Sequence, residues 1–312
     1  MTTATDVRFL LPPEAYFSDD WFAREQAQLF SRTWMFAGPS SDVPEDGRPL
    51  RVPVGTAAVT VRRVGDTLAA VRTDGGPARA ETWAGYLFVH ADPASAPDLR
   101  SWLGDLPDLI GAFQPDHLVE VAHRRYDVAA NWKLYVENHI DVYHLWYLHE
   151  RSLAGYDHPR HRWDDCTPHW SFYEPPRAGV TDEAQFVRGF PPIAHIGPDD
   201  WGSGAHLVFP NLPFATGAGF FMTYQCIPRS AEHTTIDLRV RAEPGGDHDV
   251  DSFLAMVGTV LHDEDGLACE QIQRALRSPA FAVGPLAGGL EEPITRFHES
   301  YLAATGLAVM GR

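Results

Sequence analysis

The run from Thr234 to Glu243 constrains the fold most, because its apolar residues alternate strictly with polar ones. Such alternation places the apolar side chains on one face of a β-strand and the polar ones on the other. Two β-like runs, 206–214 and 219–228, precede it, and a long amphipathic segment, 250–276, follows. Strands followed by a terminal helix are typical of an α+β domain with an antiparallel sheet. The alternating residues are Ile236, Leu238, Val240 and Ala242.

Shorter β-like runs fill the first third of the chain, after a predicted helix over about Asp19–Ser31. Glycine and aspartate separate these runs, which predicts one small antiparallel sheet. Residues 151–205 are rich in Pro, His and Trp and predict a wall of loops over a pocket. The runs are LRVPV, AAVTVRRV, TLAAVRT and GYLFVHAD.

Composition excludes several classes of protein. No apolar run is long enough to cross a membrane, and we see no signal peptide at the N-terminus. The net charge of −17 would repel phosphate backbones, so we expect no nucleic-acid partner. Three widely spaced cysteines argue against a disulfide framework and predict a cytoplasmic location. They are Cys166, Cys226 and Cys269.

A histidine-rich stretch, predicted to be helical over 131–148, is the candidate site. Asp141 and His144 are three residues apart and share a helix face, whereas His144 and His149 are five apart. To bind one metal with both histidines, the helix has to break or bulge near Leu145–Leu148. Two imidazoles suit iron, zinc or copper, and an added carboxylate suits non-haem iron(II). The spacing alone favours two partly buried helix histidines that bond to their neighbours over a metal site.

The aromatic residues of this stretch have two possible roles. Most large aromatic side chains at helical spacing belong to the core, and we predict this for Trp132 and Tyr135. Asn138 and Trp146 are predicted to face a substrate pocket.

Several ordered motifs resemble Rieske-type ring-hydroxylating oxygenase α subunits. Asn131-Trp132-Lys133, Glu137-Asn138 and Asp141-x-Tyr143-His144-x4-His149 are similar to the iron-binding stretch of that family. WFAREQAQLFSRTWMFAG, WAGYLFVHADP, FPNL and DEDGLACEQIQRALRS resemble further segments of it, in the same order. The resemblance covers nearly the whole chain and implies a helix-grip (START-like) catalytic domain with an antiparallel sheet and a long C-terminal helix.

The resemblance also implies which residues act. His144 and His149 correspond to iron ligands, and Asp265 to the carboxylate ligand of a mononuclear Fe(II) site. Periodicity by itself does not choose between Asp265 and Glu264. Asp141 corresponds to the acid that bridges toward a neighbouring subunit, and its carboxylate is expected to accept a bond from a ligand imidazole. Asn138 is a further candidate catalytic residue.

One expected feature of the family, its cluster-binding motifs, is missing from this sequence. A Rieske cluster needs Cys-x-His and Cys-x-x-His, but no cysteine precedes Cys166, and only PARAET lies between VRTDGG and WAGYLFV. We therefore expect no iron–sulfur cluster. The expected organisation is an N-terminal helical part of the catalytic domain over 1–38, a truncated Rieske-like β domain over 39–98 and the catalytic domain over 99–312.

Three functions fit these observations. The first is an iron-dependent oxygenase or oxidase acting on a small organic substrate with O₂. Its electrons would come from the substrate, an external reductase or ferredoxin, or a cluster-bearing partner subunit. The second is a lyase, isomerase or hydrolase that uses the metal as a Lewis acid. The third is a non-catalytic subunit or binding module. The resemblance further implies a homo-oligomer, with a trimer favoured.

Overall fold

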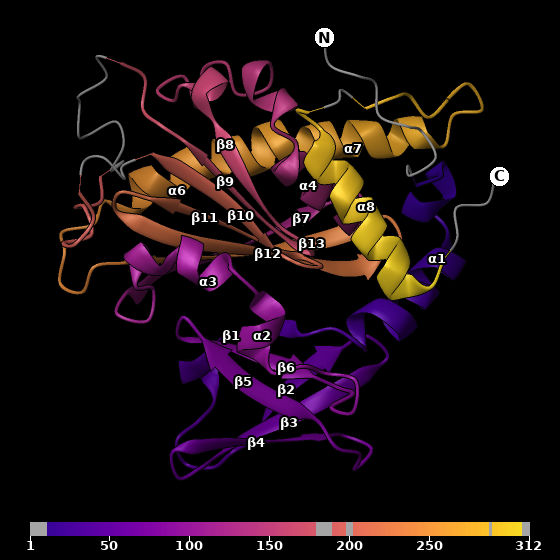
Figure 1. Ribbon diagram of the computed structural model, residues 1–312, viewed down its shortest axis with the longest axis vertical. Coiled ribbons are helices and arrows are strands. Elements are labelled where there is room, and N and C mark those ends of the chain that lie inside the picture. The colour runs from indigo at the N-terminus through magenta and orange to yellow at the C-terminus, as the bar shows by residue number, and fades with distance from the viewer. Residues whose placement is uncertain (1–10, 179–188, 198–201, 287–288, 308–312) are drawn as a thin grey trace.

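The computed structural model describes residues 11–178, 189–197, 202–286 and 289–307. A smaller β part lies below a larger part in which helices cover a broad sheet (Figure 1). The predicted α+β class, with antiparallel sheets and a long C-terminal helix, is confirmed. Within the described ranges, no helix has both the length and the apolar character needed to cross a bilayer.

The large sheet has seven antiparallel strands in the order β7-β13-β12-β11-β10-β9-β8. The alternation predicted for 234–243 is confirmed, since all four alternating apolar residues of β13 are buried. The prediction of loops over 151–205 is wrong in part, because β8, β9 and the start of β10 lie there. β8 is short and mostly polar, and β9 mixes aromatic with polar residues, so neither has a long apolar β-like run in its sequence. The strands are β7 (Val119–Val128), β8 (Arg162–Cys166), β9 (His169–Glu174), β10 (Ser203–Val208), β11 (Leu212–Gly217), β12 (Phe220–Ser230) and β13 (His233–Ala242).

The smaller part contains two three-stranded sheets, β1-β6-β5 and β2-β3-β4, where the sequence predicts one. The four predicted runs form β2, β3, β4 and β6, and the second sheet arises because β1 and β5 pair with β6. The strands are β1 (Met35–Pro39), β2 (Leu50–Val54), β3 (Ala57–Val64), β4 (Thr67–Arg72), β5 (Arg79–Trp83) and β6 (Tyr86–His90).

Helices cover both faces of the large sheet. α4 packs on β10 and β12 and α7 on β7, around the larger apolar core, while α2 and α3 close a second core on the other face. The helices are α1 (Asp19–Arg24), α2 (Leu99–Leu103), α3 (Leu106–Leu109), α4 (Trp132–Ile140), α6 (Val250–Gly258), α7 (Asp265–Leu276) and α8 (Glu292–Thr305). Two π-helical turns are η3 (Glu25–Phe30) and η9 (Thr259–Glu264). Short 3-10 turns are η2 (Pro13–Tyr16), η4 (Ser40–Asp42), η5 (Gly111–Phe113), η6 (Tyr143–Trp146) and η7 (His158–Arg160).

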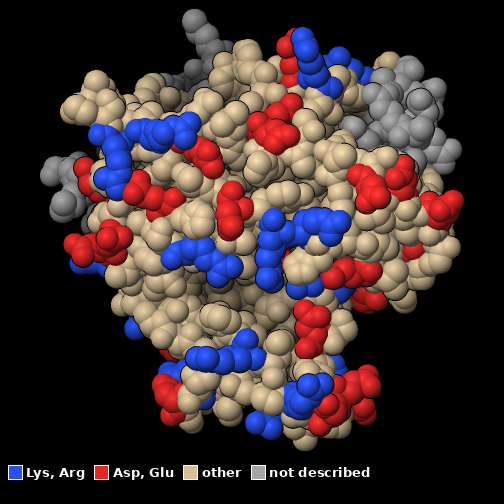
Figure 2. All heavy atoms as spheres, turned by 180° about the vertical axis from the view of Figure 1, so that it is seen from behind, with Lys and Arg blue, Asp and Glu red and all other residues tan. Residues whose placement is uncertain are grey.

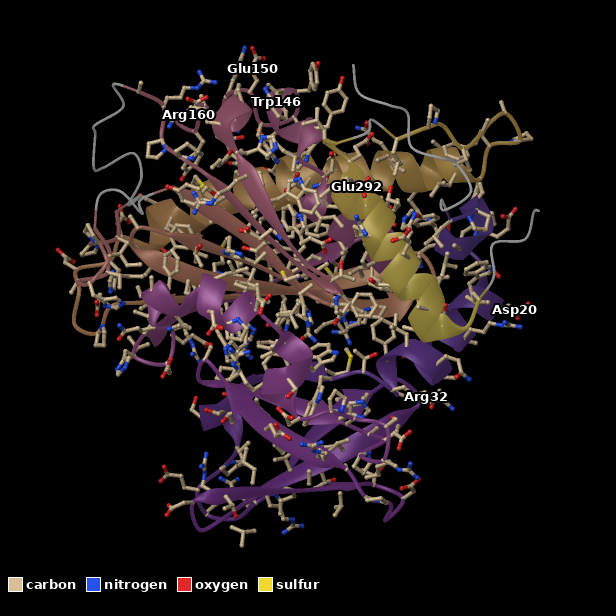
Figure 3. All side chains as sticks on the ribbon, viewed as in Figure 1. Asp20, Arg32, Trp146, Glu150, Arg160 and Glu292 are labelled. Atoms are coloured by element: carbon tan, nitrogen blue, oxygen red, sulfur yellow. The ribbon has the colours of Figure 1, made fainter. Side chains whose placement is uncertain are left out.

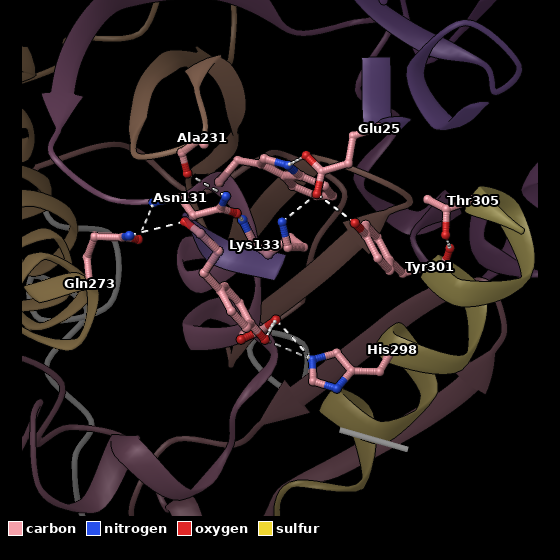
Figure 4. A network of polar contacts seen from close by, with 11 residues as sticks. Glu25, Asn131, Lys133, Ala231, Gln273, His298, Tyr301 and Thr305 are labelled. Carbon is pink, nitrogen blue, oxygen red and sulfur yellow. Dashed lines mark hydrogen bonds and ion pairs between the residues drawn. The ribbon is translucent and has the colours of Figure 1, made fainter. Parts of the chain in front are cut away.

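A buried carboxylate joins three helical segments (Figure 4). Glu25 of η3 accepts hydrogen bonds from Trp132 Nε1 at 2.8 Å and Tyr301 Oη at 2.7 Å, and it pairs with Lys133. Both charged residues are fully buried. Because desolvation of an unpaired charge is costly, these contacts hold η3, α4 and α8 in one arrangement.

The start of α4 is held by a neighbouring set of bonds. The Asn131 side chain caps the helix by accepting from Lys133 N at 2.9 Å, and Asn131 N donates to Gln273 of α7 at 2.9 Å. Further along α4, Glu137 accepts from Tyr16 Oη at 2.8 Å and lies 3.0 Å from His298 Nε2. The Asn-Trp-Lys motif therefore acts as an anchor for α4.

Acidic and basic side chains are interspersed on the face opposite to that of Figure 1 (Figure 2). Lys133 is the only lysine in the chain and is buried, so the blue surface side chains in this view are arginines. The face therefore offers no lysine for contact with a partner.

We predict that Glu25→Gln destabilises the protein by about 3–5 kcal/mol, because it leaves the Lys133 ammonium buried without a counter-charge. Urea and thermal unfolding would measure the change, with Glu14→Gln, an exposed carboxylate on η2, as the matched control. The double variant Glu25→Gln, Lys133→Met should recover part of the loss. Unfolding of Glu25→Gln at the wild-type midpoint would contradict the assigned role of the ion pair.

Candidate metal centre

The chain leaves the helical path at Asp141, directly after α4 ends at Ile140. The Asp141 carboxylate accepts from Tyr143 N at 2.7 Å and His144 N at 3.1 Å, a local bond pattern that competes with helix continuation. The predicted helix over 131–148 is therefore too long, and the expected break near 145–148 occurs earlier. This early break lets His144 and His149 approach each other, with ring centroids 4.9 Å apart.

His144 presents its Nε2 atom toward Asp265. Its Nδ1 lies 2.6 Å from the backbone carbonyl of Asp141, and this bond fixes the tautomer with Nδ1 protonated. The sequence predicts that the Asp141 carboxylate makes this bond, but that carboxylate lies 3.7 Å from Nδ1 and holds backbone amides instead. His144 Nε2 lies 3.7 Å from Asp265 Oδ1.

His149 is oriented in the same way by a different partner. Its Nδ1 lies 2.7 Å from Glu264 Oε2, which also accepts from Ser152 Oγ at 2.6 Å. Its Nε2 lies 3.0 Å from Asp265 Oδ1. Glu264 and Asp265 are neighbours at the junction of η9 with α7, so the π-helical turn directs both carboxylates toward His149.

Asp265 Oδ1 has no hydrogen bond of acceptable geometry within the part of the chain that the structure describes, although it is buried. One donor atom from each of His144, His149 and Asp265 lies within 4.8 Å of the others. An orphaned buried oxygen facing two imidazole Nε2 atoms is the arrangement that a divalent metal satisfies. Two imidazoles and one carboxylate fit iron(II).

The pKa directions of His144 and Asp265 agree with a metal-binding role. Burial lowers the pKa of His144 to about 4, so its ring is neutral at physiological pH, as a ligand must be. Burial alone would raise the pKa of Asp265, but His149, His144 and Asn138 outweigh it and lower it. The direction is opposite at His149: burial lowers its pKa, but the neighbouring carboxylates of Asp265 and Glu264 outweigh burial and raise it, so a metal ion that binds here displaces a proton.

Asp141 lies apart from the three converging donors. Burial raises the pKa of its carboxyl to about 7, a shift opposed by the amides of Tyr143 and His144. It lines a second cavity, together with Glu137 and His298, on the other side of α4. The structure thus places Asp141 at the turn before His144.

An apolar pocket opens from the three converging donors along the sheet. Its floor is formed by residues that pair across neighbouring strands, because paired residues in an antiparallel sheet point to the same face. One such row pairs Phe172 with Ala205, Ala205 with Ala215, and Ala215 with Met222. Alanine on the two central strands leaves the space that the larger edge residues enclose.

The predicted pocket residues have different outcomes. Asn138 lines the pocket and helps to lower the pKa of Asp265. Trp132 is buried in the core as predicted; Tyr135 is buried too, but it also lines the pocket. Trp146 is not among the described lining residues, and it lies near the outer surface with Glu150 (Figure 3).

Cys166 and His169 form a Cys-x-x-His spacing that the sequence interpretation overlooked. They are paired at the turn between β8 and β9. His169 Nε2 bonds to the Trp102 carbonyl at 2.8 Å, and its Nδ1 accepts from Phe209 N at 3.1 Å. Both ring nitrogens are thus occupied, so this histidine holds the hairpin in place and is not available as a cluster ligand.

The roles of two residues of the site were not predicted from the sequence. Glu264 was considered only as a rival ligand, and Ser152 was not considered. The signal for Glu264 was its place beside Asp265, but the π-helical turn that gives both side chains one target is not visible in the periodicity. Ser152 offered no signal in the sequence.

The model of a family described as ring hydroxylating alpha subunit (catalytic domain) matches residues 115–306. A chloroplastic choline monooxygenase from Atriplex hortensis is 22% identical over 231 residues, which cover 71% of this chain and 49% of that protein. The chain thus spans about half the length of this relative.

Two further proteins are similar over most of the chain. The glycine betaine monooxygenase oxygenase subunit of Chromohalobacter salexigens is 22% identical over 379 residues, covering 93% of this chain and 84% of that protein. A crystal structure of the quaternary ammonium Rieske monooxygenase CntA with an inhibitor superposes with a TM-score of 0.77 at 16% identity, covering 98% of this chain and 100% of that one. This structural likeness concerns the fold.

We predict that Asp141→Asn weakens metal binding roughly ten- to a hundredfold, because an amide group replaces one of the acceptors that hold the turn before His144. The metal dissociation constant, measured by competition with a chelator, checks this. Glu150→Gln removes an exposed carboxylate beside His149 and is the matched control. An unchanged dissociation constant in a folded Asp141→Asn variant would show that the turn holds without this carboxylate.

Proposed function

Because the chain belongs to the family of ring hydroxylating alpha subunits, whose model matches more than half of its residues, we propose that it is a mononuclear non-haem iron(II)-dependent oxygenase or oxidase. It acts on a small organic substrate with O₂. The observation that carries the proposal is the convergence of two imidazoles and a buried, orphaned carboxylate oxygen at the end of an apolar pocket.

In this proposal His144, His149 and Asp265 hold the iron. Iron(II) bound there supplies the activation of O₂. The Asp141 carbonyl and Glu264 keep both imidazoles in the tautomer that offers Nε2.

The remaining pocket residues bind and orient the substrate. Phe172, Met222 and neighbouring apolar residues exclude water from the space next to the metal ligands. Asn138 lies beside Asp265, and His139 is held by Tyr224 Oη at 2.6 Å and the His206 carbonyl at 2.8 Å. Burial lowers the pKa of His139 to about 4, so this ring is neutral, and both of its nitrogens are bonded within the protein.

We propose that the protein has no Rieske cluster of its own. Residues 73–78, between β4 and β5, contain neither Cys nor His. Asp74 closes this turn by accepting from Arg72 and from Gly76 N at 2.9 Å. The aligned stretch of the glycine betaine monooxygenase subunit, 379 residues, is longer than the whole 312-residue chain, so that alignment opens gaps in this chain. Electrons then come from the substrate, an external reductase or ferredoxin, or a cluster-bearing partner.

The organisation proposed for the chain rests on the same reasoning. Residues 1–38 and 99–312 form the catalytic unit, and 39–98 form a truncated Rieske-like β domain that contributes to a homo-oligomer, most simply a trimer. The three cysteines are free thiols, which suits a reducing, cytoplasmic location.

We predict one iron per chain in protein prepared without oxygen, and its loss in His144→Ala and in His149→Ala, because the two remaining ligands hold a divalent ion poorly. Elemental analysis measures it, with His161→Ala, a histidine outside the three converging donors, as the control. Zinc in place of iron would favour Lewis-acid chemistry. Unchanged metal content in both variants would refute the ligand assignment.

We predict that the substrate supplies its own electrons, since a four-electron oxidation of the substrate reduces O₂ fully to water. Iron(II)-loaded protein, substrate and O₂ should then form product in a single turnover without ferredoxin or NADH. Product analysis by mass spectrometry measures it. Product that forms only after a reductant or a cluster-bearing protein is added would show that the electrons are borrowed.

A further inference from the structure

A second cavity, of about 350 Å³, lies where the smaller β part meets the large sheet. Residues of β1 and β2 line one side of it, and residues of β12 and β13 line the other. In the part of the chain that the structure describes, it shares no lining residue with the apolar pocket beside the metal ligands. Arginine side chains border a hollow between the two parts of the molecule (Figure 2). We call this space the arginine cavity, after the charged residues that line it: Arg51, Arg125, Arg229, Arg239 and Asp237.

Two of these arginines already have carboxylate partners. Arg125 Nε lies 2.6 Å from Asp237 Oδ2, and Arg239 Nε lies 3.3 Å from Asp237 Oδ1. The terminal nitrogens of Arg239 lie 2.9 Å from a Glu120 oxygen and 3.6 Å from an Asp42 oxygen. Asp237 is buried between the two arginines, so its charge is compensated within the protein.

The other two arginines, Arg51 of β2 and Arg229 of β12, have no carboxylate partner among the described residues. Arg229 Nε donates to Thr235 Oγ1 at 2.9 Å, a bond that orients the guanidinium group. Its terminal nitrogens have no acceptor within the described ranges. Because Arg51 and Arg229 belong to different parts of the molecule, a ligand that pairs with both of them spans the cavity.

A second observation, independent of the arginines, also points to an anion. Gln26 lines the cavity, and its buried Nε2 atom has no hydrogen-bond partner in the described part of the chain. A buried donor without an acceptor is unfavourable, and a ligand oxygen in the cavity would satisfy it. Phe36, Val52 and Ile227 form apolar walls around the space. Such walls of low dielectric constant strengthen the field of the guanidinium groups.

We propose that the arginine cavity binds a small organic dicarboxylate, with one carboxylate on Arg51 and the other on Arg229. The planar guanidinium fork matches a carboxylate with two parallel hydrogen bonds, so two forks select a ligand with two anionic groups. The apolar walls suit a short carbon chain between those groups. The site lies apart from the metal ligands, and its occupation does not depend on the proposed iron chemistry.

The test compares succinate, glutarate and adipate with the monocarboxylates of equal chain length, butyrate, pentanoate and hexanoate. Calorimetric titration at fixed ionic strength and without O₂ measures their binding. The best dicarboxylate should bind at least about tenfold more tightly than its monocarboxylate. The net charge of −17 would by itself favour the less charged probe, so the expected order reports a local site. Equal or weaker binding of all three dicarboxylates would overturn the proposal.

Single variants locate the ligand. Arg51→Gln and Arg229→Gln should each lower the affinity for the dicarboxylate at least about tenfold, to the level of the monocarboxylate, because one anionic group loses its partner. Both side chains are exposed, so the variants should fold. Arg124→Gln, the matched control, removes an exposed arginine of β7 that does not line the cavity, and it should retain the wild-type affinity. An equal loss in Arg124→Gln would show general attraction to the surface and overturn the proposal.

A variant that changes no charge gives an independent check. Gln26→Leu removes the buried donor and should weaken dicarboxylate binding about tenfold, since a hydrogen bond to a charged oxygen is lost. Thermal unfolding confirms that the variant is folded. An unchanged affinity in folded Gln26→Leu would contradict the placement of the ligand in this cavity.

A last variant keeps this inference separate from the metal assignment, since a dicarboxylate can also bind a metal ion. His149→Ala should lose the metal and retain the preference for the dicarboxylate, because His149 lines the other pocket. Loss of the preference in His149→Ala would place the ligand on the metal and overturn the proposal. Absence of iron from wild-type protein that still shows the preference would refute the proposed iron chemistry and leave the arginine cavity as a binding site.

Discussion

The buried charge of Glu25 is the constraint on which the rest of the larger part depends. A carboxylate with no exposure is tolerated only where donors surround it, and those donors come from Trp132, Lys133 and Tyr301. The two from α4 are adjacent in the sequence, so the start of that helix is held in both position and rotation. α4 carries Asn138 and leads directly into the turn at Asp141. The contacts of Glu25 with the start of α4 therefore also fix the position of the site.

The site itself depends on two interruptions of regular helix. α4 stops at Ile140 because the Asp141 carboxylate takes the amides of Tyr143 and His144, and the π-helical turn η9 directs Glu264 and Asp265 toward one imidazole. On ideal helices neither the histidine pair nor the carboxylate pair would converge. Polar contacts and the underlying core stabilise the irregular backbone at both places. The irregular backbone in turn brings the candidate metal-binding side chains together from distant segments.

Periodicity and ordered motifs are the features of the sequence that predict the structure best. Alternation in β13 and the amphipathic segment 250–276 indicated the fold class, and the ordered motifs led to His144, His149 and Asp265, which the structure brings together. Prediction failed where side chains override propensity, as in the end of α4 and the roles of Glu264 and Ser152. It also failed for β8, a short polar strand at the edge of the sheet, and for β9, a short strand in which aromatic and polar residues are mixed.

The pocket makes two different demands on a ligand. Beside the metal-binding donors, a buried carboxylate faces two imidazoles whose other ring nitrogens are bonded to the Asp141 carbonyl and to Glu264, so a metal ion placed among them is held by coordination to Nε2 atoms and a carboxylate oxygen. On the sheet, the row formed by Phe172, Ala205, Ala215 and Met222 offers neither charge nor side-chain hydrogen bonds. An apolar part of a ligand is therefore held by shape over this row, and the surface that holds the ligand is separate from the donors that hold the metal.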